Sequence, residues 1–164
     1  MAGFLTVDAM KAYWEEQGYA LAPDADPAKV TSAWNRGASV IDRYERYFSG
    51  LRTGGFEQEH AFPRDGAATY YGQAIPNGTT PVAIANASFE AAWLEFGTPG
   101  ILSPVVTGSS MAKRKKVGQL EIEYSTSTST DIDDLVRLAT PVVTTIEGLL
   151  WQFMTPVLPA IAVV

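Results

Sequence analysis

The chain has 164 residues, 18% of them charged, and its formal net charge is −6. It contains no cysteine and a single histidine, His60, which excludes a disulfide framework, a thiolate metal site and a multi-histidine metal site. The length suits one domain with a sizeable core, and the negative charge argues against broad electrostatic capture of nucleic acid.

The charged residues are unevenly distributed along the chain. Residues 1–65 carry 17 of them and residues 113–137 carry 10, whereas residues 66–112 carry 2 and residues 138–164 carry 1. Because the two charge-poor segments lack the solvated groups that normally cover a monomer, we expect both to be buried between subunits.

Two helices are predicted in the first 50 residues. Thr6 is the N-cap candidate of the first helix, which ends at Gly18. Asp26 and Pro27 give a cap and a first-turn proline for the second helix. Its apolar stripe extends to residue 49 and predicts a helix of roughly 35 Å.

Residues 50–80 hold many glycines and prolines and predict an irregular loop region. Thr80 as cap and Pro81 as first helical residue predict a third helix that ends at Gly97. Apolar residues cover most of its circumference, so we expect it to be central in the core or covered by a neighbour on its second side.

A β-hairpin is predicted at about residues 111–124. Apolar and polar residues alternate from Leu120 to Tyr124, and Gly118 offers a turn towards a basic partner strand. Thr140 and Pro141 repeat the cap-plus-proline signal for a last helix that extends through Phe153.

The predicted fold class is mainly α: a small helical bundle with a β-hairpin insertion and an extended C-terminal arm. Residues 1–154 would form the helical domain and residues 155–164 the arm. No secretory signal is predicted at the start of the chain. The apolar segment 148–164 is shorter than the roughly 20 residues of a membrane span and holds Pro156 and Pro159. We therefore expect a soluble protein of intracellular origin, without a membrane partner.

No residue pattern in the chain predicts catalysis, a cofactor or a bound metal. His60 has the acidic neighbours Glu57 and Glu59 but no identified nucleophile, which favours a structural or surface histidine over a general base. The aspartates 131, 133 and 134 favour helix capping over metal binding. Helical spacing places the aromatic residues Trp34, Tyr44, Phe89 and Trp93 in the core rather than on a base-stacking surface.

Two segments are candidate binding sites. The first is a basic hairpin arm, whose members are Lys113, Arg114, Lys115 and Lys116. Four basic residues could bind phosphates, but a solvated strand or a contact with an acidic protein partner is favoured over nucleic acid. The second is the uncharged segment after Met154, which either packs on its own domain or is an arm that enters another subunit. Its candidate contact residues are Val157, Leu158, Ile161, Val163 and Val164.

Four blocks of the chain, residues 36–43, 57–66, 80–87 and 116–124, carry a family resemblance. The second block contains Phe62-Pro63-Arg64 and Gly66, an aromatic-Pro-Arg-x-Gly pattern in which Phe62 stands where the family usually has Trp. The fourth is Lys-Val-Gly followed by an alternating strand that ends in Tyr124. In this order the blocks resemble the neck adaptor, or head-tail connector, proteins of tailed phages, over about residues 4–154. Members are often labelled "putative DnaT-like single-stranded DNA-binding protein".

The resemblance implies a non-enzymatic helical adaptor that assembles as a ring, usually of twelve copies. The ring would lie beneath the portal protein and above a stopper or tail-terminator protein, in the neck of a virion made in the host cytoplasm. Genomic DNA would pass through its lumen without sequence-specific binding. In such a ring the basic hairpin arm would contact a neighbouring subunit, the portal or the lumen, and the C-terminal arm would dock on the portal or a neighbouring subunit. The family label implies a different function, a single-stranded DNA-binding replication protein, and a hydrolase using His60 is a third alternative.

Overall fold

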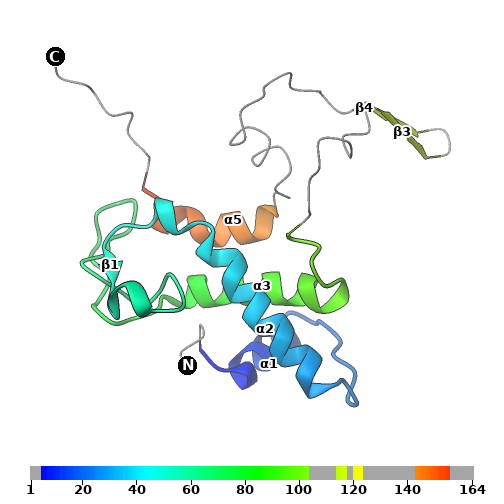
Figure 1. The fold of residues 1–164 in the computed structure, drawn as a ribbon, viewed down its shortest axis with the longest axis horizontal. Coiled ribbons are helices and arrows are strands. Elements are labelled where there is room, and N and C mark those ends of the chain that lie inside the picture. Colours follow the sequence, from blue (N-terminus) through cyan, green and yellow to red (C-terminus); the bar gives the residue numbers. More distant parts are fainter. Residues whose placement is uncertain (1–4, 104–113, 118–119, 124–142, 156–164) are drawn as a thin grey trace. The chain divides into compact units, whose positions relative to one another are not determined.

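A computed structural model describes residues 5–103, 114–117, 120–123 and 143–155 (Figure 1). The chain forms two compact units, residues 1–99 together with 143–164, and residues 100–142. The first unit contains the helices and the second contains a β-hairpin. The predicted fold class, mainly α with a hairpin, is confirmed.

The first two helices begin where their caps predict. Helix α1 spans Val7–Glu16, and the Thr6 side chain accepts a hydrogen bond from the Ala9 amide at 3.1 Å. Helix α2 spans Pro27–Asp42, and the Asp26 carboxylate accepts from the Ala28 amide at 2.9 Å. Each capping oxygen satisfies an amide that has no partner within its helix.

Helix α2 ends seven residues before the predicted boundary at residue 49. The Tyr44 amide bonds to the Ile41 carbonyl, which tightens the last turn, and a short 3₁₀ helix, η1 (Glu45–Tyr47), follows. The Asp42 carboxylate is bound instead to the loop at residues 60 and 61. Tertiary hydrogen bonds therefore end a helix whose apolar stripe continues in the sequence.

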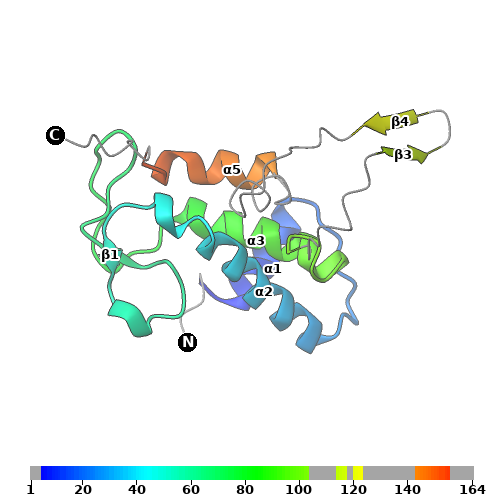
Figure 2. The same ribbon diagram turned by 45° about the horizontal axis from the view of Figure 1, so that its top comes forward.

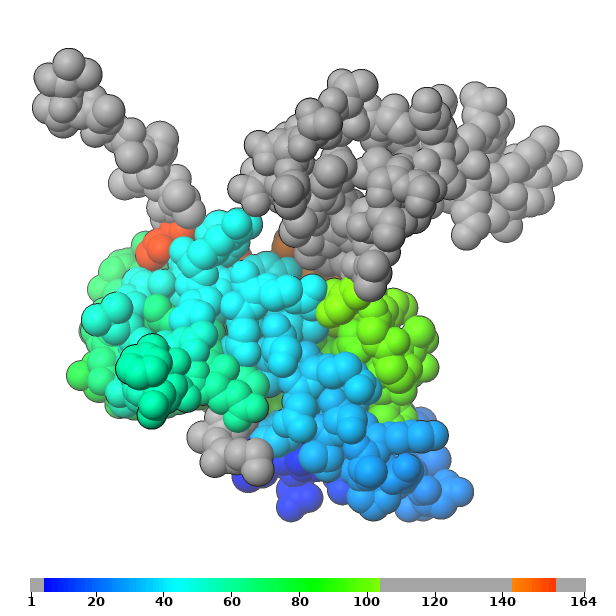
Figure 3. All heavy atoms as spheres, viewed as in Figure 1, coloured from blue at the N-terminus to red at the C-terminus, as the bar shows by residue number. Residues whose placement is uncertain are grey.

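Helix α3 (Val82–Gly97) is the centre of the first unit, as its apolar circumference predicts. Helices α1, α2 and α5 (Thr144–Leu150) all contact it, and α2 crosses it in both ribbon views (Figure 1, Figure 2). The space-filling view shows α2 and the loop after it covering most of α3 on this face (Figure 3). The helix begins at Val82, with Pro81 as cap residue, so the prediction of Thr80 as cap was one position early.

The position of α3 corrects the interpretation of the charge-poor segment 66–112. Nine residues of α3 are buried within the chain's own unit, including Glu90 and Glu95, the two charged residues of that segment. Much of the missing charge therefore reflects an internal helix rather than a contact between subunits.

Residues 43–66 form a loop with little regular structure; a loop was predicted from residue 50 onwards, whereas residues 43–49 were predicted to be helical. Strand β1 (Leu51–Arg52) pairs with β2 (Arg64–Asp65) in antiparallel register, and the 3₁₀ helix η2 (Gly55–Glu57) lies between them. Below, this segment is called the 43–66 loop.

The last described segment returns to this loop. Helix α5 passes directly into the 3₁₀ helix η3 (Trp151–Phe153). Met154 then pairs with Phe48, and the Thr155 amide bonds to the Tyr47 carbonyl at 2.7 Å. The predicted capping residues Thr140 and Pro141 lie outside the described residues.

In the second unit, β3 (Arg114–Val117) pairs with β4 (Leu120–Glu123) in antiparallel register. The register places Arg114 opposite Glu123 and Lys116 opposite Glu121. The predicted hairpin, with a basic strand facing an acidic one, is confirmed.

Candidate binding surfaces

The two candidate sites of the sequence are described only in part. Arg114, Lys115 and Lys116 lie on β3 of the hairpin, and Lys113 lies outside the described residues. The five candidate contact residues of the arm, Val157 to Val164, also lie outside them, as do the aspartates 131, 133 and 134. The description of the helical unit ends at Thr155.

The second resemblance block surrounds a buried arginine. Arg64 is 5% exposed, and its guanidinium donates to the carbonyls of Ser49 (2.8 Å), Gly50 (2.6 Å) and Ala61 (3.1 Å). It also pairs with Glu45 at 3.1 Å. An arginine is suited to this place because its planar fork can supply several donors at once. The arginine of the motif therefore holds the 43–66 loop together.

Glu45 joins this arginine to a second one nearer the surface. Arg52 Nε donates to the Glu45 carboxylate at 2.7 Å. These hydrogen bonds, Arg52 first and Arg64 next, lower the pKa of Glu45 against the effect of burial. The carboxylate is thus ionised in the folded protein at neutral pH.

His60 is a structural histidine. It is 5% exposed, and its Nδ1 lies 2.8 Å from the Asp42 carboxylate, whose other oxygen accepts from the Ala61 amide at 2.7 Å. The hydrogen bond to Asp42 raises the pKa of His60, although burial opposes the rise. The sequence suggested Glu57 and Glu59 as the acidic partners; the bonded one is Asp42, 18 positions away.

The first block lies where α2 crosses α3. A Cβ atom on Gly37 would lie 2.3 Å from the Ser88 carbonyl oxygen and 2.7 Å from the Ala92 amide nitrogen, so only glycine fits there. Asp42 in the same block binds the second block through His60 and Ala61. The first two blocks of the resemblance thus have structural roles in the described residues.

A buried carboxylate, unpredicted from the sequence, joins the middle of α3 to α1 and the segment after it. Glu90 is 7% exposed and accepts hydrogen bonds from the hydroxyls of Tyr13 and Tyr19, each at 2.7 Å. Burial, followed by the bond to Glu90, raises the pKa of Tyr13, and that bond is the main cause of the raised pKa of Tyr19. Both phenols are neutral donors at physiological pH.

Helical spacing predicted the core aromatics only in part. Phe89 is 2% exposed, whereas Trp34, Tyr44 and Trp93 are half-buried. The Trp93 ring stacks on Tyr19 with 4.8 Å between ring centroids. A half-buried aromatic ring on a helix still packs against its neighbours. The prediction of an apolar stripe is therefore correct, but it overestimated how deeply three of these rings are buried.

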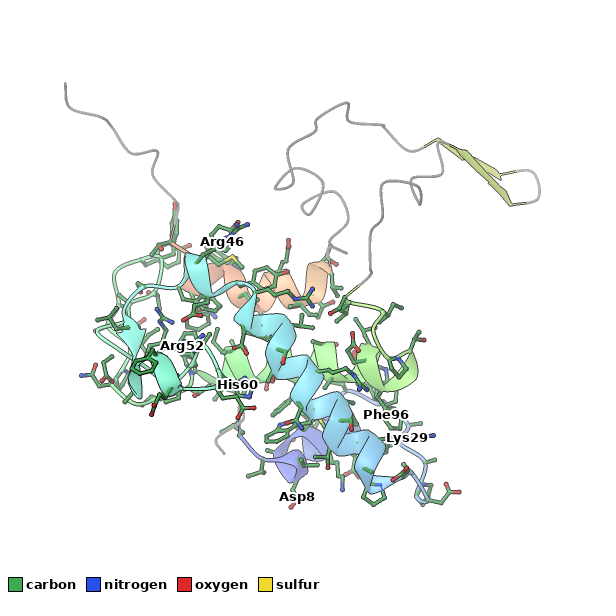
Figure 4. All side chains as sticks on the ribbon, viewed as in Figure 1. Asp8, Lys29, Arg46, Arg52, His60 and Phe96 are labelled. Atoms are coloured by element: carbon green, nitrogen blue, oxygen red, sulfur yellow. The ribbon has the colours of Figure 1, made fainter. Side chains whose placement is uncertain are left out.

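The described part of the helical unit has an acidic surface without a cluster of free cations. Residues 5–103 and 143–155 contain 7 basic and 13 acidic residues. Arg36, Arg52 and Arg64 form ion pairs with glutamates. Lys29 and Arg46 lie at opposite ends of the unit (Figure 4). Because basic side chains provide most of the affinity for a phosphate backbone, this surface is poorly suited to bind nucleic acid.

One group of large side chains is exposed together. Tyr70, Tyr71 and Trp151, here called the aromatic cluster, are 52%, 76% and 48% exposed. Their ring centroids lie 5.5 to 6.0 Å apart, and Tyr71 meets both other rings edge to face. Each ring supports the others, so the cluster is an ordered apolar surface.

The backbone that presents the cluster comes from two distant segments. The Thr69 amide bonds to the Gln73 carbonyl, and Gly72 takes a φ of +79° between them, a conformation that favours glycine. The Tyr70 amide bonds to the Gln152 carbonyl at 2.6 Å, which joins this turn to η3. The sequence analysis missed the cluster; its signal was Tyr70-Tyr71-Gly72 in a segment without charge.

Within the described residues, no group of three or more His, Cys, Asp or Glu side chains is placed to hold a metal ion. No helix of that part of the chain is both long and apolar enough to cross a bilayer.

Comparison with protein families gives one match. Residues 2–160 match the family described as "Putative DnaT-like ssDNA binding protein". The chain belongs to this family. The description agrees with the single-stranded DNA-binding alternative of the sequence analysis, and it does not mention a ring, a portal or a phage neck. No curated protein and no solved structure gives a match.

Proposed function

We propose that this protein is a non-enzymatic structural adaptor in the head-tail connector of a tailed phage or related particle. It would form a ring of about twelve copies between the portal protein and a stopper or tail-terminator protein, and genomic DNA would pass through the lumen. The observation that carries the proposal is the ordered aromatic cluster of Tyr70, Tyr71 and Trp151 on an acidic domain.

Two physical features support an adaptor. Exposed, mutually packed aromatic rings are typical of the anchors at protein interfaces. An acidic surface lets DNA slide, because it makes few of the basic contacts that release counterions and hold the phosphate backbone. The motif residues of the family resemblance stabilise the fold, which suits a scaffold.

The test is the assembly state of the chain, measured as mass alone and after mixing with isolated portal rings. We expect the full chain to join the portal as a ring. A variant that lacks residues 156–164 should stay folded but fail to join; Thr155 is kept because its amide and hydroxyl both donate to the Tyr47 carbonyl. A chain that does not associate with portal rings at any concentration would refute the adaptor.

The second candidate function, single-stranded DNA binding in replication, is favoured by the family description. Its structural support is the basic strand β3, with Arg114, Lys115 and Lys116. This function requires tight binding to oligonucleotides that falls steeply with salt, because each phosphate contact releases a counterion.

Oligonucleotide titration at two salt concentrations separates the candidates. DNA binding by β3 predicts that changing Lys113, Arg114, Lys115 and Lys116 to Ser abolishes affinity. The same change at Lys11 and Lys29, which are exposed on α1 and α2, is the matched control and should have little effect. Absence of binding by the unchanged chain at low salt would eliminate this candidate.

A further inference from the structure

We propose that the aromatic cluster of one copy is the docking site for residues 156–164 of the next copy. The inference rests on the proposed ring and names the contact that would join its subunits. Three observations support it: the ordered acceptor surface, the place where the chain leaves the domain, and the chemistry of the nine residues that follow Thr155.

The acceptor surface is apolar, exposed and fixed in place. Tyr71 alone is 76% exposed, although it contacts both other rings. Two backbone segments hold the cluster through the bond from the Tyr70 amide to the Gln152 carbonyl. Little order would be lost when a partner covers it, because the rings are already positioned by one another.

The chain leaves the domain next to this surface. The Gln152 carbonyl bonds to Tyr70, Met154 pairs with Phe48, and the Thr155 amide bonds to Tyr47. The backbone thus passes the cluster at Gln152 and contacts Tyr47 at Thr155, the last described residue. In the proposed ring the acceptor is the cluster of the next copy, because an arm that covered its own cluster would join no subunits.

The chemistry of residues 156–164 matches the cluster. The segment has no charged or polar side chain and contains Pro156 and Pro159. Apolar peptides that contain proline bind to exposed aromatic rings, because proline restricts the free peptide and reduces the entropy lost on docking.

The length of the arm allows contact with a neighbouring copy. Nine extended residues span at most about 30 Å, and a domain of about 100 residues has a radius of gyration of about 13 Å. An arm that leaves one subunit and an acceptor on the next make a head-to-tail contact. Such a contact forms a closed ring when the rotation between copies closes.

Disulfide trapping tests the contact directly, because the natural chain contains no cysteine. Chains with Leu158→Cys are mixed with chains that carry Tyr71→Cys, or with the matched control Phe56→Cys, whose aromatic ring is 93% exposed on η2. We expect the Tyr71→Cys mixture to form mixed dimers at least tenfold faster than the control. Equal rates would overturn the proposal.

A single chain that carries both Tyr71→Cys and Leu158→Cys distinguishes an arm that docks on another copy from an arm that docks on its own cluster. The proposal predicts linked dimers and larger species on a non-reducing gel. A product that is mostly closed within one chain would show that the arm covers its own cluster and would refute the exchange between copies.

Complementation provides an independent measurement. Tyr71→Ala removes a ring from the acceptor and keeps the arm, whereas deletion of residues 156–164 removes the arm and keeps the acceptor. Their mixture should form a one-to-one complex that grows no further, and each variant alone should remain a monomer. Failure of the mixture to associate would contradict the docking site. Failure of the unchanged chain to join portal rings would instead refute the adaptor function.

Discussion

The crossing of α2 with α3 and the 43–66 loop adjoin each other, yet different forces stabilise them. At the crossing, small residues allow two helix backbones to approach, and Gly37 has no space for a Cβ atom. In the loop, buried side chains with charge replace regular structure: Arg64 donates to three backbone carbonyls and one carboxylate. One region depends on shape and the other on satisfied hydrogen bonds.

This contrast explains why two kinds of substitution should be damaging in different ways. In the helical region a larger side chain should destabilise the fold, because the packed backbones cannot move apart without losing other contacts. In the loop, removal of the charged guanidinium should destabilise the fold, because the carbonyls and the carboxylate around Arg64 would be left without their donor.

The largest effect is expected for Arg64→Met, which keeps much of the volume and removes the guanidinium. We expect the free energy of unfolding to fall by about 3–5 kcal/mol, since three backbone carbonyls and the half-buried Glu45 lose a buried donor. The matched control is Arg52→Met, which also loses a bond to Glu45 but is 25% exposed at its side chain; about 1–2 kcal/mol is expected there. Urea unfolding measures both, and equal losses would contradict the central role of Arg64.

A smaller loss is expected for Gly37→Ala. The new methyl group would overlap the backbone of α3 at Ser88 and Ala92, which should cost about 1–3 kcal/mol despite the better helix propensity of alanine. Gly148→Ala in α5 is the control, because nothing lies within 4 Å of its Cβ position. We expect that variant to be as stable as the natural chain or slightly more stable in thermal unfolding. If both variants unfold alike, the crossing is not limited by space.

The smallest effect is a pH dependence from His60. Its pKa is raised in the folded state by the hydrogen bond to Asp42, so the folded state binds the proton more tightly than the unfolded chain does. The resulting stabilisation is complete below the unfolded pKa of about 6.5 and is lost as pH rises through the higher folded pKa. Asp42, Glu59 and Arg52 are the charged groups that act on His60.

Unfolding measured between pH 5.5 and 9 tests this prediction. The natural chain should lose stability as the pH rises through that window, and His60→Gln should remove this component of the slope. Glu45 does not interfere, because its pKa is lowered and its contribution changes only in acid. An identical slope in the two proteins would show that the bond to Asp42 contributes no net proton linkage.

The sequence by itself determined the local features of this protein. Asp26 and Pro27 mark the start of α2, the apolar circumference marks α3 as central, and alternation with a basic partner marks the hairpin. These features depend on residues close together in the chain, where helical or strand periodicity and capping chemistry act.

Only the tertiary structure decided where α2 ends, what His60 binds and how the aromatic cluster forms. Asp42 and His60 are 18 positions apart, and Tyr70 and Trp151 come from the two separate segments of the chain that form the helical unit. No periodicity links such residues, because their proximity depends on how the loop and α5 pack around the central helix. For the same reason, charge-poor segments in the sequence indicated burial but did not distinguish an internal helix from an exposed binding surface.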